Sequence, residues 1–290
     1  MKLAAPADYG DFRCLAGQCR HTCCAGWEIA VDPDTAARYR RIPGAFGDRL
    51  RAGMTADGFR LGEDGRCPFL NGENLCEIIL NLGEDALCQV CRDHPRYRNF
   101  WSDRVEIGLG LCCEAAVDQL FRRQEPLRLA VLADDGAQTP PLTREEQALM
   151  QLRDSLLRIL QDRSRPLSAR LADWRRALGL KRTGPGAWAE GLLELEPLDP
   201  AWPALLRRIR PRACRPWTPA DEQICAALLY RELPGALTEG HVLGRAAFPL
   251  RAAELLRHLP GDPRENLRLF SAEIEYSREN LDAALAMLEA

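Results

Sequence analysis

Ten of the twelve cysteines of this 290-residue chain fall within its first 113 residues, and this uneven distribution constrains the fold more than any other feature. The ten form three groups that are far apart along the chain. Thiols from separate segments can only meet after the chain has folded. The sequence therefore predicts a folded module organised around Cys14, Cys19, Cys23, Cys24, Cys67, Cys76, Cys88, Cys91, Cys112 and Cys113.

Neither the start of the chain nor its charge indicates secretion or membrane insertion. No apolar leader follows Met1, and no run of about 18 uncharged apolar residues occurs. The net charge of −3 comes without blocks of like charge, which argues against a nucleic-acid or membrane surface. We therefore expect a cytoplasmic protein that acts on a protein or a small molecule. In that reducing compartment, clustered thiols favour metal ligation over disulfides.

The spacing of the thiols bears on which metal they hold. Cys88 and Cys91 form the one C-x2-C pair of the chain, a spacing that lets two thiolates grip one metal centre. Structural zinc usually carries two such pairs, whereas irregular spacings that pool nine or ten cysteines favour iron–sulfur clusters. We expect an iron–sulfur cluster of the 4Fe-4S type, with zinc as the alternative. His21 and His94 lie among the cysteines and are expected to have structural roles.

The second half of the chain carries helix signals and only two cysteines. Helix starts are marked by N-cap residues that precede a capping glutamate or a proline, at Thr143, Thr218 and Asp262. The stretch 133–141 is rich in Asp, Gly and Pro and is expected to be a linker. The sequence thus predicts a mainly α protein. Residues 1–125 would form a cysteine-rich metal-binding module with short strands, and residues 126–290 an all-helical domain.

Short motifs accompany the cysteines. They are Cys23-Cys24 with Gly26-Trp27, Cys67-Pro68-Phe69-Leu70, Leu75-Cys76, Leu87-Cys88 with Cys91-Arg92, and Cys112 with Glu114-Ala115-Ala116. Two later segments, Glu273-Ile274-Glu275-Tyr276 and, more weakly, Tyr230-Arg231, belong to the same set of motifs. Together these residues resemble the cysteine-rich flagellin lysine N-methylase family. Where this chain has Cys113 the family more often has proline, so Cys113 is left out of the expected ligands.

The resemblance implies methyl transfer from S-adenosylmethionine to a lysine of a flagellin-like protein. It implies a cysteine-ligated cluster held by Cys14, Cys19, Cys23, Cys24, Cys67, Cys76, Cys88, Cys91 and Cys112. Methyl transfer needs a neutral amine and therefore a base or a desolvated site. The candidates for this catalytic work are Glu114, Glu273, Glu275 and Tyr276. Trp27 and Tyr230 offer aromatic faces on which the sulfonium of the cofactor can rest.

A second hypothesis belongs to a different class. The chain could be a non-enzymatic zinc-binding or iron–sulfur-binding module that senses redox state and docks a partner on its helices. Binding of S-adenosylmethionine distinguishes the two hypotheses. Radical chemistry is not indicated, because the C-x4-C-x3-C spacing of the first cysteines differs from the C-x3-C-x2-C signature of radical enzymes that use this cofactor.

Overall fold

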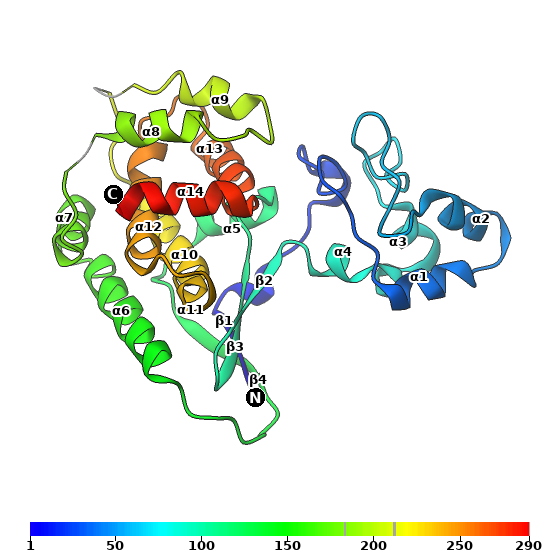
Figure 1. Ribbon diagram of the computed structural model, residues 1–290, viewed down its shortest axis with the longest axis horizontal. Coiled ribbons are helices and arrows are strands. Elements are labelled where there is room, and N and C mark those ends of the chain that lie inside the picture. Colours follow the sequence, from blue (N-terminus) through cyan, green and yellow to red (C-terminus); the bar gives the residue numbers. More distant parts are fainter. Residues whose placement is uncertain (183, 211–212, 290) are drawn as a thin grey trace. The chain divides into compact units, whose positions relative to one another are not determined.

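The computed structural model describes residues 1–182, 184–210 and 213–289. It is mainly helical with a small four-stranded sheet, which confirms the expected mainly α class (Figure 1). Contacts within the chain divide it into two compact units. Residues 13–96 form the cysteine unit, and residues 1–12 together with 97–290 form the helical unit. This grouping differs from the division at 125/126 that the sequence suggests, and independent folding of either part stays a prediction.

The sheet lies in the helical unit, in the order β2-β3-β1-β4. Its strands are β1 (Lys2–Pro6), β2 (Arg96–Phe100), β3 (Arg104–Leu109) and β4 (Leu129–Asp134). β1 runs parallel to β3 and antiparallel to β4. Three of these strands lie within residues 1–125, where the sequence predicts short strands, and β4 lies in the part for which it predicts helices alone. The first strand of the chain can only complete its hydrogen bonds against β3 and β4, and these follow the cysteine unit.

In the part of the helical unit that the structure describes, ten helices follow from residue 114 onward. They are α5 (Glu114–Arg122), α6 (Arg144–Leu160), α7 (Leu167–Ala177), α8 (Pro185–Leu193), α9 (Ala201–Leu206), α10 (Pro219–Glu232), α11 (Ala236–Glu239), α12 (Val242–Leu256), α13 (Pro263–Phe270) and α14 (Arg278–Glu289). A π-helical turn, Ser271–Glu275, joins α13 to α14. Turns of this kind are rare and often occur at functional sites.

The expected helix starts are confirmed in atomic detail. The backbone N–H of Glu146 donates to the Thr143 hydroxyl, and the Glu146 carboxylate accepts from the Thr143 N–H at 2.7 Å. Asp221 and Thr218 form the same reciprocal arrangement, a capping box, at the start of α10. Asp262 accepts from the N–H of Arg264 at the start of α13. Each contact satisfies backbone donors that an isolated helix leaves open.

The core of the helical unit is built around α10 and α12. Both are buried along nearly their whole length and pack against each other, and α14 also packs against α12 (Figure 1). A helix that is buried on all sides needs apolar residues around its whole circumference, as in the Leu-rich and Ala-rich sequence of α12. Trp188, Phe248 and Phe270 form an aromatic contact set on one side of this layer.

The cysteine unit has short helices and isolated β-bridges in place of a sheet. The helices are α1 (Pro33–Arg40), α2 (Gly44–Gly53), α3 (Glu77–Leu82) and α4 (Gln89–Asp93). Its small core combines apolar side chains with thiols: Ile29, Tyr39, Leu50, Phe59, Cys67, Phe69, Ile78, Leu87 and Cys88. The Tyr39 hydroxyl donates to the carbonyl of Ala86 at 2.7 Å and so ties α1 to the segment that precedes α4.

A buried ion pair joins the sheet to α6 in the helical unit. The guanidinium of Arg153 donates to both carboxylate oxygens of Glu106 at 2.6 and 2.9 Å. The Glu106 side chain is 0% exposed and that of Arg153 is 5% exposed. Removing one partner of such a pair leaves a buried charge without compensation, whereas removing both charges together costs much less.

We expect Arg153→Met to lower the free energy of unfolding by about 3–5 kcal/mol, because Glu106 then keeps an unpaired buried charge. The double variant Glu106→Gln/Arg153→Met should recover most of that loss. Urea unfolding of the three proteins measures this. Arg176→Met, which breaks an exposed ion pair with Asp173, is the control and should leave the midpoint unchanged. Equal losses in the single and double variants would contradict the assignment.

Candidate functional site

Five thiols converge in the core of the cysteine unit, and we call them the thiol cluster: Cys24, Cys67, Cys76, Cys88 and Cys91. Cys67 and Cys88 are buried, and the other three pack against the same apolar side chains. They come from four segments that are separate along the chain. Within this set the expected C-x2-C pair is in direct contact, since the side chains of Cys88 and Cys91 are hydrogen-bonded to each other.

The thiols of the cluster influence one another electrostatically. The hydrogen bond from Cys91 lowers the pKa of Cys88 to about 7, and burial opposes this shift. The hydrogen bond from Cys23 lowers the pKa of Cys24 to about 7 in the same way. Burial raises the pKa of Cys67 to about 12, and negative charge on Cys24, Cys76 or Cys88 raises it further. The cluster therefore contains both thiolate and thiol forms near neutral pH.

The remaining expected ligands lie outside this cluster. Cys14 and Cys23 are exposed and Cys19 is half-buried, all within the surface segment that precedes the core of the cysteine unit. The Cys14 sulfur accepts from the N–H of Ala16. Cys112 belongs to the helical unit. The nine residues are thus distributed over three environments, which their spacing along the chain does not reveal.

The donor atoms of the thiol cluster are suited to a metal, but their arrangement is not that of a complete set of ligands. Soft thiolates in a buried, largely apolar environment are the donors that zinc and iron–sulfur clusters take. Among the residues that the structure describes, however, no group of three or more His, Cys, Asp or Glu side chains is arranged to hold a metal ion. The metal-binding character of the cysteine unit therefore stays a prediction.

Trp27, an expected cofactor contact, is engaged within the cysteine unit. Its indole N–H donates to the carbonyl of Cys23 at 2.8 Å. Its ring stacks on His94 with centroids 6.3 Å apart. Burial lowers the pKa of His94 to about 4, so the imidazole is neutral at physiological pH. Within this unit both residues have structural roles, and a role of Trp27 towards a cofactor stays a prediction.

A second polar assembly lies in the helical unit, and we call it the Arg231 cluster: Tyr97, Cys112, Arg231, Glu232, Glu275 and Tyr276. Arg231, near the end of α10, places its guanidinium between two tyrosine rings, 5.0 Å from the centroid of Tyr97 and 4.5 Å from that of Tyr276. Its Nε lies 2.9 Å from Glu232 and 3.1 Å from Glu275. Desolvated cation–π and ionic contacts of this kind hold a guanidinium firmly.

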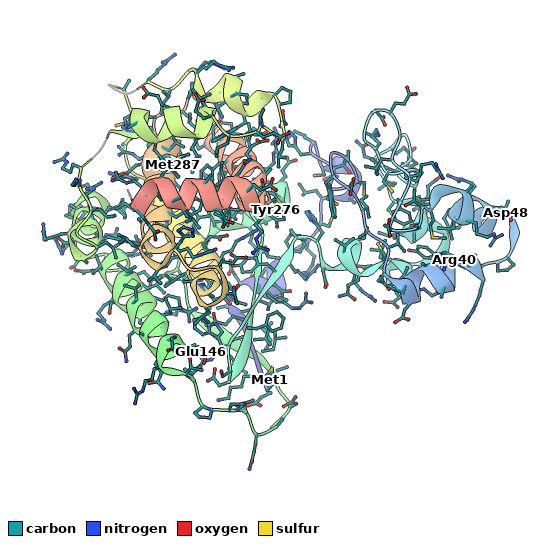
Figure 2. The ribbon with its side chains drawn as sticks, in the orientation of Figure 1. Met1, Arg40, Asp48, Glu146, Tyr276 and Met287 are labelled. Carbon is teal, nitrogen blue, oxygen red and sulfur yellow. The ribbon has the colours of Figure 1, made fainter. Side chains whose placement is uncertain are left out.

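The π-helical turn is what brings Glu275 and Tyr276 to this place. The wider turn buries both Glu273 and Glu275, and Tyr276 follows at the entry to α14 (Figure 2). The side-chain amide of Asn280 donates to the carbonyl of Glu273 at 2.9 Å and to that of Glu196 at 3.0 Å. These two bonds satisfy backbone carbonyls near the irregular turn and hold it in place.

Cys112 meets this turn through Tyr276. The Tyr276 hydroxyl is hydrogen-bonded to the Cys112 sulfur. Burial raises the pKa of Cys112 to about 11 and holds that of Tyr276 well above its ordinary value. Both groups are therefore protonated at neutral pH. The Tyr276 residue is 43% exposed, so solvent reaches part of the Arg231 cluster.

The expected catalytic residues separate into three positions. Glu275 and Tyr276 belong to the Arg231 cluster. Glu273 instead accepts from the backbone N–H groups of Leu198 and Asp199, at 2.9 and 2.6 Å, and anchors that loop. Glu114 is the first residue of α5. The catalytic assignments of these four residues stay predictions.

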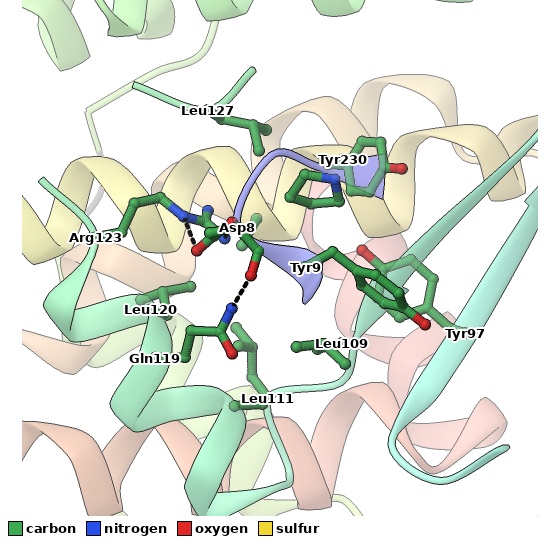
Figure 3. A pocket seen from close by; sticks show the side chains of 13 residues that line it. Asp8, Tyr9, Tyr97, Leu109, Leu111, Gln119, Leu120, Arg123, Leu127 and Tyr230 are labelled. Atoms are coloured by element: carbon green, nitrogen blue, oxygen red, sulfur yellow. Dashed lines mark hydrogen bonds and ion pairs between the residues drawn. The ribbon is translucent and has the colours of Figure 1, made fainter. Parts of the chain in front are cut away.

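Tyr230 lines a separate small pocket in the helical unit (Figure 3). Its hydroxyl donates to the carbonyl of Ile107 at 3.2 Å, and its ring lies 5.7 Å from the Arg153 guanidinium. Tyr9 and Tyr97 also line the pocket, whose cavity of about 30 Å³ holds about two water molecules. As it stands, the cavity is too small for S-adenosylmethionine, and the role of Tyr230 towards that cofactor stays a prediction.

Sequence reasoning missed Glu232. It is the last residue of α10, where a charged residue after Tyr230-Arg231 looks like a solvated helix end. Its side chain is only 6% exposed. Burial raises the pKa of Glu232 to about 8, the nearby carboxyl of Glu275 adds to the rise, and Arg231 and Arg245 oppose it. No local sequence signal marks this position, because its neighbours come from α12 and the π-helical turn.

Comparisons with known proteins agree with the cysteine motifs. The chain is 27% identical over 166 residues to proteins named lysine-N-methylase from Salmonella choleraesuis and Salmonella typhimurium, an alignment that covers 52% of this chain and 40% of each relative. It is also 27% identical over 141 residues to the flagellar biosynthetic protein FliU of Salmonella muenchen, which covers 44% of this chain and 81% of FliU. The resemblance to the flagellin lysine N-methylase family is confirmed.

The similarity covers only part of the relatives. The chain spans about 40% of the length of the two lysine-N-methylases. No family model and no solved structure matches it. None of the helices in the described ranges has the length and apolar character needed to cross a membrane.

The Arg231 cluster leaves no room for a side chain at Gly110, at the end of the loop that carries Cys112. A Cβ there would lie 1.8 Å from the Tyr276 hydroxyl and 2.9 Å from an Arg231 nitrogen. We expect Gly110→Ala to displace Tyr276 and to increase the reactivity of Cys112 towards iodoacetamide, measured by peptide mass spectrometry. Gly10→Ala, where no atom lies within 4 Å of the added carbon, should leave Cys112 unchanged. The same labelling rate in both variants would contradict the packing described here.

Proposed function

We propose that this chain is a protein-lysine N-methyltransferase that uses S-adenosylmethionine and acts on a flagellin-like protein. The observation that carries the proposal is the Arg231 cluster. Cys112, Arg231 and the pair Glu275-Tyr276 lie in three distant stretches that each resemble the methylase family, and they meet at one place. The names of the relatives supply the reaction class.

The reaction needs few groups. The lysine amine loses a proton, its lone pair attacks the methyl carbon, and the carbon–sulfur bond breaks with its electrons going to the sulfur. In this proposal the partly exposed Tyr276 contacts the substrate, and Glu275 behind it supplies the negative charge that attracts the ammonium and accepts its proton. Arg231 holds Glu275 in position at 3.1 Å.

The thiol cluster is the proposed place of the metal cofactor. Cys24, Cys67, Cys76, Cys88 and Cys91 would hold an iron–sulfur cluster, and four of them suffice for the 4Fe-4S type. Zinc remains the alternative because the same thiolates bind it. When bound, either metal supplies cross-links between the four segments of a unit that has a small apolar core. Cys14, Cys19, Cys23 and Cys112 lie outside this set and stay predictions as ligands.

We expect protein purified without oxygen to carry iron and acid-labile sulfide. Cys88→Ser and Cys91→Ser should each lose most of the metal, because they remove one half of the C-x2-C pair in the buried cluster. Cys214→Ser, at an exposed cysteine of the helical unit, should retain it. Metal analysis and sulfide determination of the four proteins give the result. Stoichiometric zinc without sulfide would exclude the iron–sulfur cluster, and retention of metal in both variants would exclude this ligand assignment.

We expect Glu275→Gln to lower methylation of a flagellin substrate by about 10²-fold or more, the range in which removal of a positioned base falls. The amide has nearly the same volume, so the fold should persist. Transfer of labelled methyl groups from S-adenosylmethionine measures the rate, and circular dichroism monitors the fold. Glu145→Gln, at an exposed position in the first turn of α6, is the control. Wild-type activity in Glu275→Gln would remove Glu275 from the catalytic site.

The alternative is a non-enzymatic metal-binding or redox-sensing module. It is favoured by one observation: the thiol cluster forms within the cysteine unit alone, without any residue of the helical unit. Titration calorimetry with S-adenosylmethionine decides between the two hypotheses. If the wild-type protein does not bind it, the alternative replaces the methyltransferase.

A further inference from the structure

Two buried carboxyl groups meet in the Arg231 cluster. Glu232 ends α10 and Glu275 ends the π-helical turn, and their side chains are 6% and 0% exposed. Both carboxyl groups lie next to the same nitrogen, the Nε of Arg231, at 2.9 Å for Glu232 and 3.1 Å for Glu275. Two ionised carboxylates repel at such a distance, so the contact requires a proton between them.

The hydrogen-bond donors around Glu275 lead to the same conclusion. The Nε–H of Arg231 donates to Glu232 at 2.9 Å and is not aligned with Glu275. Within the described ranges, neither carboxylate oxygen of Glu275 has a hydrogen-bond partner. A buried carboxylate without a donor is costly. A protonated Glu232 supplies the missing donor.

The charges that face this pair balance when one proton is present. Arg231 and Arg245 are the buried cations, and Arg245 lies 3.3 Å from Glu232 and also contacts Glu239 of α11. Three carboxylates, Glu232, Glu239 and Glu275, would face these two cations. One proton removes the excess negative charge. Arg278 of α14 reaches Glu239 from a position that is 76% exposed, where solvent screens its charge, and the hydroxyl of Tyr97 of β2 is neutral at physiological pH because burial raises its pKa.

We propose that Glu232 is a positioning residue of this site, which shares one proton with Glu275 and thereby holds the π-helical turn that presents Tyr276. This inference rests on the proposed function for its role in methylation. The shared proton itself is a property of the folded chain. It ties the end of α10 to the turn, where Arg231 also donates to the backbone carbonyl of Glu275 at 3.4 Å.

The shared proton determines whether rising pH favours the closed or the open form of the π-helical turn. The pKa of Glu232 is raised from 4.5 to about 8 in the folded protein. When the turn opens to water, Glu232 regains its ordinary pKa, so the closed form binds more protons than the open form between these values. Opening should therefore become more favourable by about tenfold per pH unit between pH 6 and 8, and should level off above pH 8.

Hydrogen exchange of the segment 271–277 tests this pH dependence, after correction for the intrinsic chemical exchange rate. The wild-type protein should show the rise and the plateau. Glu232→Gln should show neither, because its amide donates to Glu275 at every pH. Glu145→Gln, at an exposed position in the first turn of α6 and outside this charge network, should keep the rise. His241 pairs with Glu289 and is present in all three proteins. Equal slopes in the wild type and Glu232→Gln would overturn the shared proton.

Methylation tests the positioning role. Glu232→Gln should keep the rate at pH 7 within about threefold of the wild type, and Glu232→Ala should lower kcat by about tenfold or more with little change in KM, as expected when a bound geometry is disturbed. Equal activities of the Gln and Ala variants would overturn that role. If the wild type shows no methyl transfer at any pH, the proposed function fails, and the exchange slopes alone decide whether the proton-sharing pair exists.

Discussion

The structure of the helical unit depends on how the buried helix α10 accommodates its own negative charges. Carboxylates near both of its ends lie in the protein interior, and each is paired with arginine. Asp221 pairs with Arg215, Glu222 with Arg163 and Arg170, and Glu232 with Arg231 and Arg245. A buried carboxylate without such a partner costs several kcal/mol, on the order of 3–5. These pairs connect α10 to the segment before it, to the loop between α6 and α7, and to α7 and α12.

The use of arginine suits this architecture. The chain has only two lysines, Lys2 and Lys181, so arginine supplies nearly all of its positive charge. A planar guanidinium can contact two carboxylates and an aromatic face at once, as Arg231 does between Tyr97 and Tyr276. A lysine ammonium cannot reproduce this geometry. The cluster that we propose as the methyl-transfer site is thus built by the same interaction that anchors α10.

The core of the cysteine unit is built differently, with thiols among its buried side chains. Its helices are short and its apolar core is small, so thiols occupy positions that larger side chains fill in the helical unit. Buried thiols are acceptable as small apolar groups, but a cluster in which Cys88 and Cys24 have a pKa of about 7 also carries thiolate charge near neutral pH. In the function that we propose, this unit would gain stability from a bound metal, and the helical unit would supply the residues that act on the lysine.

Local features of both units could be derived from the sequence alone. The capping residues Thr143, Thr218 and Asp262, the mainly helical class and the contact of Cys88 with Cys91 all depend on residues within one or two turns of each other, so spacing determines them. Tertiary structure alone decided which five of the nine expected cysteines converge. It also paired the first strand of the chain with β3 and β4 and brought Glu232 next to Glu275. Cys24 and Cys67, like Glu232 and Glu275, are 43 residues apart in the sequence. Their proximity depends on how the segments of each unit pack, and no spacing along the chain encodes it.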